Sequence, residues 1–418
     1  QGRRRRRDVV NDGLDLFDEV SEDDSGARRR STRSSRPARR SRRRRRRGVT
    51  WSVVLVLVLV IAGGVYYGLR QFAGFGSYPD YTGSGDRDVV FGVNQGDSTT
   101  TIGDNMVTAN IVKSAKAFVK AADNNSAVAS VQPGFYVLKE HMSGTAAASA
   151  IVSSHSRVGV LEIKSGWQLD DTTSTAGKVT EGILSHIAAA TCATLNGSKT
   201  CVSAADLRAA ITNDDPTALG VPTWAAPIVK AADPKHRMEG MIMPGVYNLK
   251  PGENATQTLK RIMDSASVQL LADGLPSPGQ QNTGFTPYQV LTLASIVERE
   301  SGTTADMPKI ARVFYNRLQQ GMQLQSDATV DYALDRPMVA TAPAERPGAG
   351  AYDTYDNAGL PPTPVSSPSA AAIQAANAPA AGNWLYFVVC QKDRSSCFAT
   401  NLADHNKNVT LAHQNGVF

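Results

Sequence analysis

Two carboxylates near the end of an apolar segment, Glu298 and Glu300, are the residues of this chain best suited to acid–base chemistry. At about 100° per residue around a helix, Glu298 falls beside Leu291 and Glu300 beside Leu293, on the apolar side. A carboxylate rarely occupies a side that faces a core unless it is paired or used in catalysis. Burial also raises the pKa of a carboxyl group, as a general acid working near neutral pH requires.

A purely structural explanation competes with this one. Both glutamates could form ion pairs with Arg299, Arg312 or Arg317 and tie helices together. Such pairs would also satisfy a buried carboxylate. The pattern of residues alone leaves both explanations open.

The segment that carries both glutamates has the signals of a helix over residues 287–300. Thr286 can cap it, Pro287 suits the first helical position, and Gln289 completes a capping box. The pair Ser301-Gly302 is typical of a helix end. The side opposite the apolar arc is expected to be polar and consists of Thr292, Ser295 and Arg299.

A polar cluster follows the helix at a distance of two elements. A second helix is predicted over residues 307–320 with Gly321 as its stop, and then come Gln325, Ser326 and Asp327. A buried acid followed by such a loop indicates a cleft. Asp327 is also the only second carboxylate near in sequence that could act with Glu298 as a glycosidase pair.

Several blocks of sequence carry a resemblance to a known family. They are LASIVERE (293–300), VFYNRL (313–318), MQLQSD (322–327), YDTY (352–355), GLPPTP (359–364), YF (386–387) and TNLADHNK (400–407). In this order they resemble the YceG-like (MltG) family of endolytic murein transglycosylases. The resemblance is dense over about residues 238–412 and loose before them.

The resemblance implies a lytic transglycosylase in which Glu298 is the catalytic acid. Such an enzyme cleaves the MurNAc–GlcNAc bond within nascent glycan strands during cell-wall assembly. One glutamic acid protonates the glycosidic oxygen, and its carboxylate then accepts the proton of the muramyl C6 hydroxyl. A 1,6-anhydro end forms without water, and no cofactor is implied.

Supporting roles fall to polar residues in or next to these blocks. Residues expected to bind substrate are Gln325, Ser326, Asp327, Tyr355 and Asn357. Candidate supporting residues are Glu300, Asn316 and His405, and His405 is as well explained by a structural role. For Arg317 we expect an ion pair with Glu300 or a helix-packing contact.

Other classes of function lack their motifs. The chain has no G-x-S-x-G, no H-E-x-x-H, and no S-x-x-K with a later K-T-G. The alternatives that remain are a noncatalytic peptidoglycan-binding scaffold of the elongation machinery and a glycan hydrolase. Peptidoglycan synthases and elongation proteins are candidate partners in either case.

The first 48 residues hold 18 Arg against 8 acidic residues, whereas the remaining 370 carry 26 basic and 30 acidic groups. This tail has little apolar content, so we expect it to be disordered. Arginine blocks can indicate nucleic-acid binding. The apolar run at residues 49–69, which follows the tail, explains these arginine blocks better, so no nucleic-acid partner is expected.

Residues 49–69 form an uncharged run rich in Val and Leu, bounded by Arg47 and Arg70. About 20 apolar residues are needed to cross a bilayer. Arginine before the run places that side in the cytoplasm. We therefore predict a single-pass anchor in the cell membrane, with a cytoplasmic N-terminus and an extracytoplasmic catalytic domain.

Four cysteines fall in two close pairs in the part predicted to be exported, where disulfides persist. We expect Cys192 to bond to Cys201, and Cys390 to Cys397 across a hairpin. A zinc site is the alternative, but neither pair has CxxC spacing or a nearby histidine. No metal site is therefore expected.

The expected fold is α+β. Residues 70–87 are a predicted linker, 88–235 a small mixed α/β membrane-proximal lobe, and 236–418 an α+β catalytic lobe. By the resemblance, the first lobe is LysM-like. A weak repeat links the lobes: PGFYVLK (133–139) is echoed 111 residues later by PGVYNLK (244–250), which predicts two related strand-and-helix units.

Overall fold

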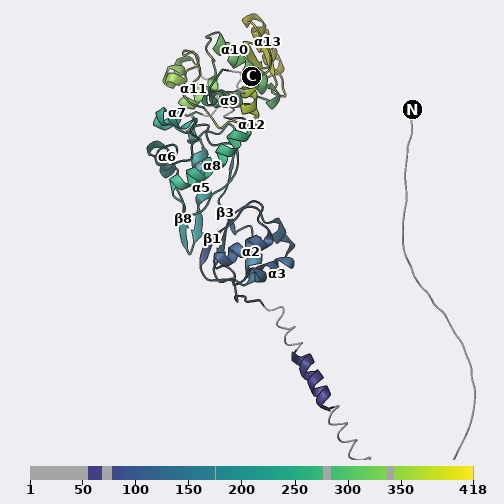
Figure 1. Cartoon of the computed structure of the whole chain (residues 1–418). Helices are drawn as coiled ribbons and strands as arrows, with labels where there is room; N and C mark the ends of the chain where they lie inside the picture. Colours follow the sequence, from purple (N-terminus) through teal and green to yellow (C-terminus); the bar gives the residue numbers. More distant parts are fainter. Residues whose placement is uncertain (1–54, 68–77, 175, 276–283, 337–342, 418) are drawn as a thin grey trace, which may run out of the picture. The chain divides into compact units, whose positions relative to one another are not determined.

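The computed structural model describes residues 55–67, 78–174, 176–275, 284–336 and 343–417 (Figure 1). The chain divides into two units, residues 1–77 and 78–418. The predicted disordered tail, residues 1–48, lies outside the described residues.

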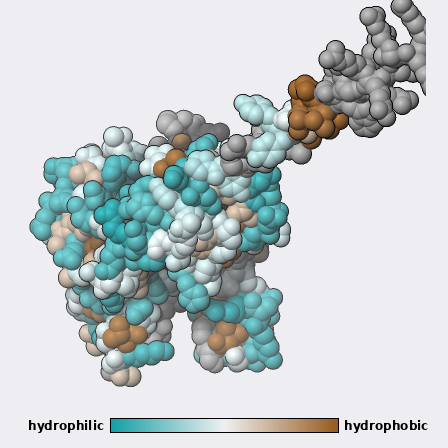
Figure 2. All heavy atoms as spheres, turned by 90° about the horizontal axis from the view of Figure 1, so that it is seen from below, coloured by the Kyte–Doolittle hydropathy of each residue, from teal (hydrophilic) through white to brown (hydrophobic). Residues whose placement is uncertain are grey.

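In the first unit, residues 55–67 form a helix whose large apolar side chains are exposed and appear brown in Figure 2. Among the described residues, no helix has both the length and the apolar character needed to cross a membrane. The predicted anchor at 49–69 extends into residues that are not described.

The second unit begins with a small antiparallel sheet and its helices. Strand β1 (Asp88–Val93) pairs with β2 (Gly134–Lys139), and β2 pairs with β3 (Arg157–Val158). The helices packed with this sheet are α2 (Thr99–Thr108), α3 (Ala115–Asp123), η1 (Ser126–Ser130) and α4 (Gly144–Ile151). Serine hydroxyls cap the three α-helices, as Ser98, Ser114 and Ser143. Their core is separate and includes Phe91, Met106, Phe118 and Leu138.

The end of the predicted linker belongs to this lobe. The Asp80 carboxylate accepts a hydrogen bond from the backbone of Gly144 at 3.0 Å. Arg87 forms an ion pair with Glu140 at 2.7 Å. These two contacts fasten the end of the segment predicted as a linker to the lobe.

The predicted repeat is confirmed in the structure. The second PG-containing segment forms β9 (Gly245–Asn248), which pairs antiparallel with β4 (Val160–Ile163). The hydroxyl of Tyr136 donates to the Gln132 carbonyl, and that of Tyr247 to the Met243 carbonyl, both at 2.6 Å. Each tyrosine thus fastens its strand to the residue four positions earlier.

The two sheets follow each other without a loop at Gly159, between β3 and β4. Gly159 has φ +72°, and a Cβ there would lie 1.8 Å from the Leu249 carbonyl oxygen. Only glycine fits this close approach. The two hydrophobic cores also divide here, between Ile151 and Leu161, and not at the predicted domain boundary of residue 235.

The second core extends from Leu161 to Ala376 and holds most of the remaining elements. Its first part contains β5 (Thr172–Thr173), β6 (Val179–Thr180), α5 (Ile183–Thr191), β7 (Ala193–Leu195), β8 (Ser198–Thr200), α6 (Ala204–Asn213), α7 (Ala226–Ala231) and η2 (Pro234–His236). After β9 come α8 (Ala255–Ala272), α9 (Pro287–Glu300), η3 (Thr304–Asp306), α10 (Met307–Gln319), α11 (Asp327–Ala333), η4 (Pro343–Tyr352) and α12 (Ala370–Asn377). The chain ends with β10 (Tyr386–Val389), β11 (Ser396–Ala399) and α13 (Leu402–Asn415). The fold is α+β, as predicted.

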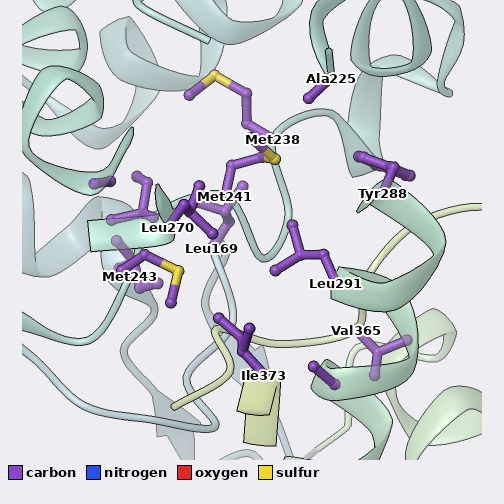
Figure 3. Packing of buried hydrophobic residues seen from close by; sticks show 14 of the residues in the cluster. Leu169, Ala225, Met238, Met241, Met243, Leu270, Tyr288, Leu291, Val365 and Ile373 are labelled. Carbon is purple, nitrogen blue, oxygen red and sulfur yellow. The ribbon is translucent and has the colours of Figure 1, made fainter. Parts of the chain in front are cut away.

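Helix α9 is the centre of this part and is packed against α10, α11 and α12. Leu291 of α9, Leu270 of α8 and Ile373 of α12 are fully buried in one core (Figure 3). The predicted bounds and the capping box of Thr286 with Gln289 are confirmed.

The predicted polar side of α9 is not a solvent-facing side. Thr292 is 2% exposed and Ser295 is not exposed at all. The Ser295 hydroxyl donates to the Thr292 carbonyl and accepts the backbone N–H of Val365. Because other helices and the segment at Val365 cover α9 on this side too, its small polar residues are buried and hydrogen-bonded.

Both predicted disulfides are confirmed, Cys192–Cys201 and Cys390–Cys397. The first closes the β7–β8 hairpin and the second the β10–β11 hairpin. The second hairpin packs against α13 and α10. It is the one that contributes to the site described next.

Candidate functional site

The last turn of α9 directs Glu298 and Glu300 to different places. Two helical positions correspond to about 200° around the axis. Glu300 lines a cavity of about 450 Å³, and Glu298 lines another of about 360 Å³. The two glutamates, which the sequence placed on one apolar arc, therefore have separate surroundings.

Glu300 is a partly buried residue with a desolvated carboxyl group. The Ser326 hydroxyl donates to Glu300 Oε1 at 2.5 Å. Burial raises the pKa of the Glu300 carboxyl, and the negative charge of Asp327 acts in the same direction, while the Ser326 hydrogen bond opposes them. This is the state that a general acid needs near neutral pH.

Among the described residues, Glu300 forms none of the arginine ion pairs of the structural alternative. Arg299, Arg312 and Arg317 instead donate to backbone carbonyls, those of Gly166, Ala380 and Leu385 respectively. These arginines therefore hold loops in place. The Glu300 carboxyl is stabilised by a serine hydroxyl and keeps its raised pKa.

Four of the predicted site residues line the cavity of Glu300: Gln325, Asp327, Tyr355 and His405. They come from the loop before α11, the start of α11, the segment after η4, and α13. The cavity is therefore assembled from parts of the chain that span more than 100 residues.

One wall of this cavity is a hydrogen-bonded pair. The Tyr355 hydroxyl donates to Asp327 Oδ1 at 2.9 Å. The guanidinium of Arg346 lies 3.5 Å from the centre of the Tyr355 ring. Burial and the charge of Asp327 raise the pKa of Tyr355, so its hydroxyl stays protonated and holds the Asp327 carboxylate in place.

Gln325 occupies a backbone conformation that is unusual for its residue type. Its φ is +52°, in the left-handed region where a residue other than glycine is strained. Its backbone N–H donates to the Thr354 carbonyl, and its side-chain oxygen accepts from Arg317 at 3.3 Å. These contacts hold the exposed Gln325 side chain at the cavity.

The opposite wall is strand β10 with the start of α13. Tyr386, Phe387, Val388 and Val389 line the cavity together with Leu402 and His405. The His405 ring stacks on Tyr386 at 5.3 Å between centres. Burial and the charge of Arg317 lower the pKa of His405, so this imidazole is neutral near neutral pH. The wall is largely aromatic and apolar.

Glu298 was predicted to be the catalytic acid, but within the described part of the chain its carboxylate forms no hydrogen bond with the residues that line the cavity of Glu300. Its Oε2 accepts the backbone N–H of Ser369 at 3.0 Å and the Ser369 hydroxyl at 2.5 Å. Ser369 is the N-cap of α12. A carboxylate at this position is stabilised by the helix dipole, so Glu298 fastens α9 to α12.

Three other predicted site residues have structural contacts. Ser326 is 2% exposed and supports Glu300. The Asn316 amide donates to the carbonyls of Gly382 and Trp384, before β10. The Asn357 amide donates to the carbonyls of Gly350 and Asp353 and so closes its own loop. Asn316 and Asn357 thus shape the walls without lining the cavity.

Sequence reasoning missed the wall formed by β10 and the contact of Arg346. Tyr386 and Phe387 are visible in the sequence as part of a strand, yet alternation along a strand does not reveal which face meets a distant helix. Arg346 has no local signal. Among the described residues, no group of three or more His, Cys, Asp or Glu side chains is arranged to hold a metal ion.

Comparison with known proteins gives a family match over most of the chain. The sequence model described as the YceG-like family matches residues 91–411. An endolytic murein transglycosylase of Streptococcus pneumoniae strain R6 is 26% identical over 370 residues, which are 86% of this chain and 64% of that protein. This chain thus spans less than two thirds of the length of that relative.

Two further matches cover different shares of the chain. An endolytic murein transglycosylase of Bacillus subtilis strain 168 is 32% identical over 177 residues, 41% of this chain and 47% of that protein. A crystal structure of a YceG-like protein from Listeria monocytogenes covers 77% of this chain and 99% of its own, with 24% identity and a TM-score of 0.47.

Proposed function

Because the chain belongs to the YceG-like family, we propose that it is a peptidoglycan lytic transglycosylase and that Glu300 is its acid and base. One observation carries the choice of residue. Glu300 is the carboxyl group with a raised pKa in the cavity that Gln325, Asp327 and Tyr355 also line. We therefore move the proposed acid from Glu298 to Glu300.

The proposed reaction has two proton transfers at one carboxyl group. Protonated Glu300 donates to the oxygen between MurNAc C1 and GlcNAc, and the C1–O bond breaks as the sugar develops positive charge. The C6 hydroxyl of the same MurNAc attacks C1, and the Glu300 carboxylate accepts its proton. The products are a GlcNAc hydroxyl and a 1,6-anhydro-MurNAc end, with no water consumed.

The other cavity residues have roles suited to this charge. The Asp327 carboxylate, held by the Tyr355 hydroxyl at 2.9 Å, can stabilise the positive charge at C1. The exposed Gln325 amide suits hydrogen bonds to hydroxyl and acetamido groups. Tyr386 and Phe387 offer apolar surface to a sugar ring. His405 is a neutral neighbour that packs against Tyr386.

Mass spectrometry of glycan fragments released by the purified full-length chain tests this function. We expect fragments that end in 1,6-anhydro-MurNAc, and we expect Glu300→Gln to remove them. Glutamine keeps the size of the side chain but cannot deliver the proton. Endolytic cleavage should shorten long strands at internal bonds before disaccharides accumulate.

Different products would support the alternatives. Reducing ends in place of anhydro ends would indicate a glycan hydrolase with Asp327 as the second carboxylate. Binding of glycan without any cleavage by the wild-type chain would indicate a noncatalytic scaffold. Anhydro products at the wild-type level from Glu300→Gln would return the acid to Glu298.

The proposal includes membrane anchorage through residues 49–69 with the N-terminus in the cytoplasm. The uncharged run of 21 residues and the 18 arginines before it support this topology. Protease added to intact spheroplasts should degrade the part from residue 78 onward and leave an epitope tag in the arginine-rich tail protected. Loss of the tag from intact spheroplasts would show the reverse orientation.

A further inference from the structure

A second cavity, of about 360 Å³, lies where Glu298 and Arg299 leave α9, and the proposed reaction does not use it. Its lining includes Trp167, from the segment after β4, and Arg394, from the turn of the β10–β11 hairpin. Trp167 is half-buried and stacked on His186, with 4.2 Å between ring centres and 18° between planes. The indole therefore has a fixed orientation.

Most charged groups of this cavity have protein partners. Asp170 pairs with Arg208, and Arg336 with Glu345. The carboxylate of Glu181 lies 4.0 Å from the imidazole of His186. The Glu298 carboxylate is held by Ser369, as described above.

Two guanidinium groups remain, those of Arg299 and Arg394, and neither has an ion pair within the described residues. Arg299 donates to the Gly166 carbonyl, but its Nε has no hydrogen-bond partner in the described part of the chain. Burial lowers the pKa of Arg299. An anion in the cavity would offset this desolvation.

The cavity is within reach of a substrate bound at Glu300. Both cavities adjoin the last turn of α9, and a helix with its side chains is about 10–12 Å across. The β10–β11 hairpin contributes to both, with β10 at Glu300 and Arg394 here. An extended peptide of four or five residues spans about 15 Å, which is enough to pass around the end of one helix.

We propose that this cavity binds the peptide that peptidoglycan carries on its muramyl sugars, through a carboxylate held by Arg299 and Arg394. The apolar side chains of such a peptide pack against Trp167. The inference rests on the proposed function, because it takes its ligand from the same substrate. It makes the peptide a second point of attachment that orients the strand relative to Glu300.

Calorimetric titration of the full-length chain with a synthetic stem pentapeptide tests the inference without any catalytic step. We expect Arg394→Gln to weaken binding about tenfold, because it removes a charge-assisted hydrogen bond. Lys392→Gln is the matched control, since Lys392 is an exposed cation of the same turn that does not line the cavity. A peptide whose carboxylates are amidated should bind to the wild-type chain as weakly as the unmodified peptide binds to Arg394→Gln.

Several results would overturn the inference. The peptide could bind to wild type and Arg394→Gln with equal affinity, or wild type could bind the amidated and unmodified peptides equally well. Wild type could also fail to bind the peptide at millimolar concentration. Displacement of the peptide by equimolar inorganic phosphate would indicate an unselective anion site. Peptide binding with the expected arginine dependence, but no glycan cleavage, would refute the proposed function and leave the peptide site standing.

Discussion

Glu298 and Glu300 are two residues apart on one helix, and the comparison between them shows how surroundings determine the chemistry of a carboxyl group. Glu298 accepts two hydrogen bonds from Ser369 at the start of α12. Glu300 is desolvated beside Asp327 and has a raised pKa. One carboxylate accepts hydrogen bonds at a helix N-terminus, and burial raises the pKa of the other.

An apolar arc alone therefore does not identify a catalytic acid. Both glutamates satisfy the sequence criterion equally. The two glutamates differ in their hydrogen-bond partners, which come from distant parts of the chain. Ser326 lies 26 residues after Glu300, and Ser369 lies 71 residues after Glu298.

Glu300→Gln should reduce the rate of anhydro-MurNAc formation by at least about 10²–10⁴-fold, the range for removal of a general acid or base. Glu298→Gln is the matched control because it makes the same change two residues away. It should retain most of the activity, since its carboxylate binds Ser369 and not the predicted substrate residues. Rates are measured by chromatography of digested glycan strands.

Melting temperatures of the two variants show whether a loss of activity is due to unfolding. Both variants should remain folded, and a loss of stability should be larger for Glu298→Gln, whose helix contact is weakened. A large loss of activity in Glu298→Gln at unchanged stability, with an active Glu300→Gln, would reverse the assignment of the acid.

Asp327→Asn should reduce the rate by about tenfold and change its pH dependence. The negative charge of Asp327 raises the pKa of Glu300, so its removal lowers that pKa. The protonated form of Glu300, which is the active acid, is then lost at lower pH. The alkaline limb of the rate profile should therefore move to lower pH in Asp327→Asn.

Tyr355→Phe is the control for this pH effect. It removes the hydroxyl that donates to Asp327 but leaves the carboxylate charge in place. Its alkaline limb should move less than that of Asp327→Asn. An unchanged alkaline limb in Asp327→Asn would show that the limb does not report Glu300.

Much of the local structure around α9 was predictable because short-range signals determine it. The bounds of α9, its capping box and the hairpin closed by Cys390 and Cys397 were all confirmed. Each depends on residues within one turn or one hairpin. The capping groups satisfy backbone donors that a helix start always leaves free.

The surroundings of α9 were not predictable in the same way. Thr292 and Ser295 were expected on the polar side of α9 and are buried, because other helices and the segment at Val365 enclose this helix. Gln325, Asp327, Tyr355 and His405 were expected near the acid and do line one cavity. The sequence could not say which glutamate they meet, since that depends on how loops from four elements close over the helix.

The smallest predicted effect tests the structural side of the contrast, the bond between Glu298 and Ser369. Ser369→Ala should lower the free energy of unfolding by about 1 kcal/mol, because the serine hydroxyl also caps α12 by accepting the N–H of Ala372. Combined with Glu298→Gln in a double-mutant cycle, the two changes should be non-additive by about 0.5–1 kcal/mol, since they share one hydrogen bond. The same cycle with Glu300→Gln should be additive, because Glu300 bonds to Ser326 and not to Ser369. Urea unfolding of the four variants of each cycle measures both coupling energies. Additivity of Ser369→Ala with Glu298→Gln, or coupling of Ser369→Ala to Glu300→Gln, would contradict the division of the two glutamates into a structural and a chemical residue.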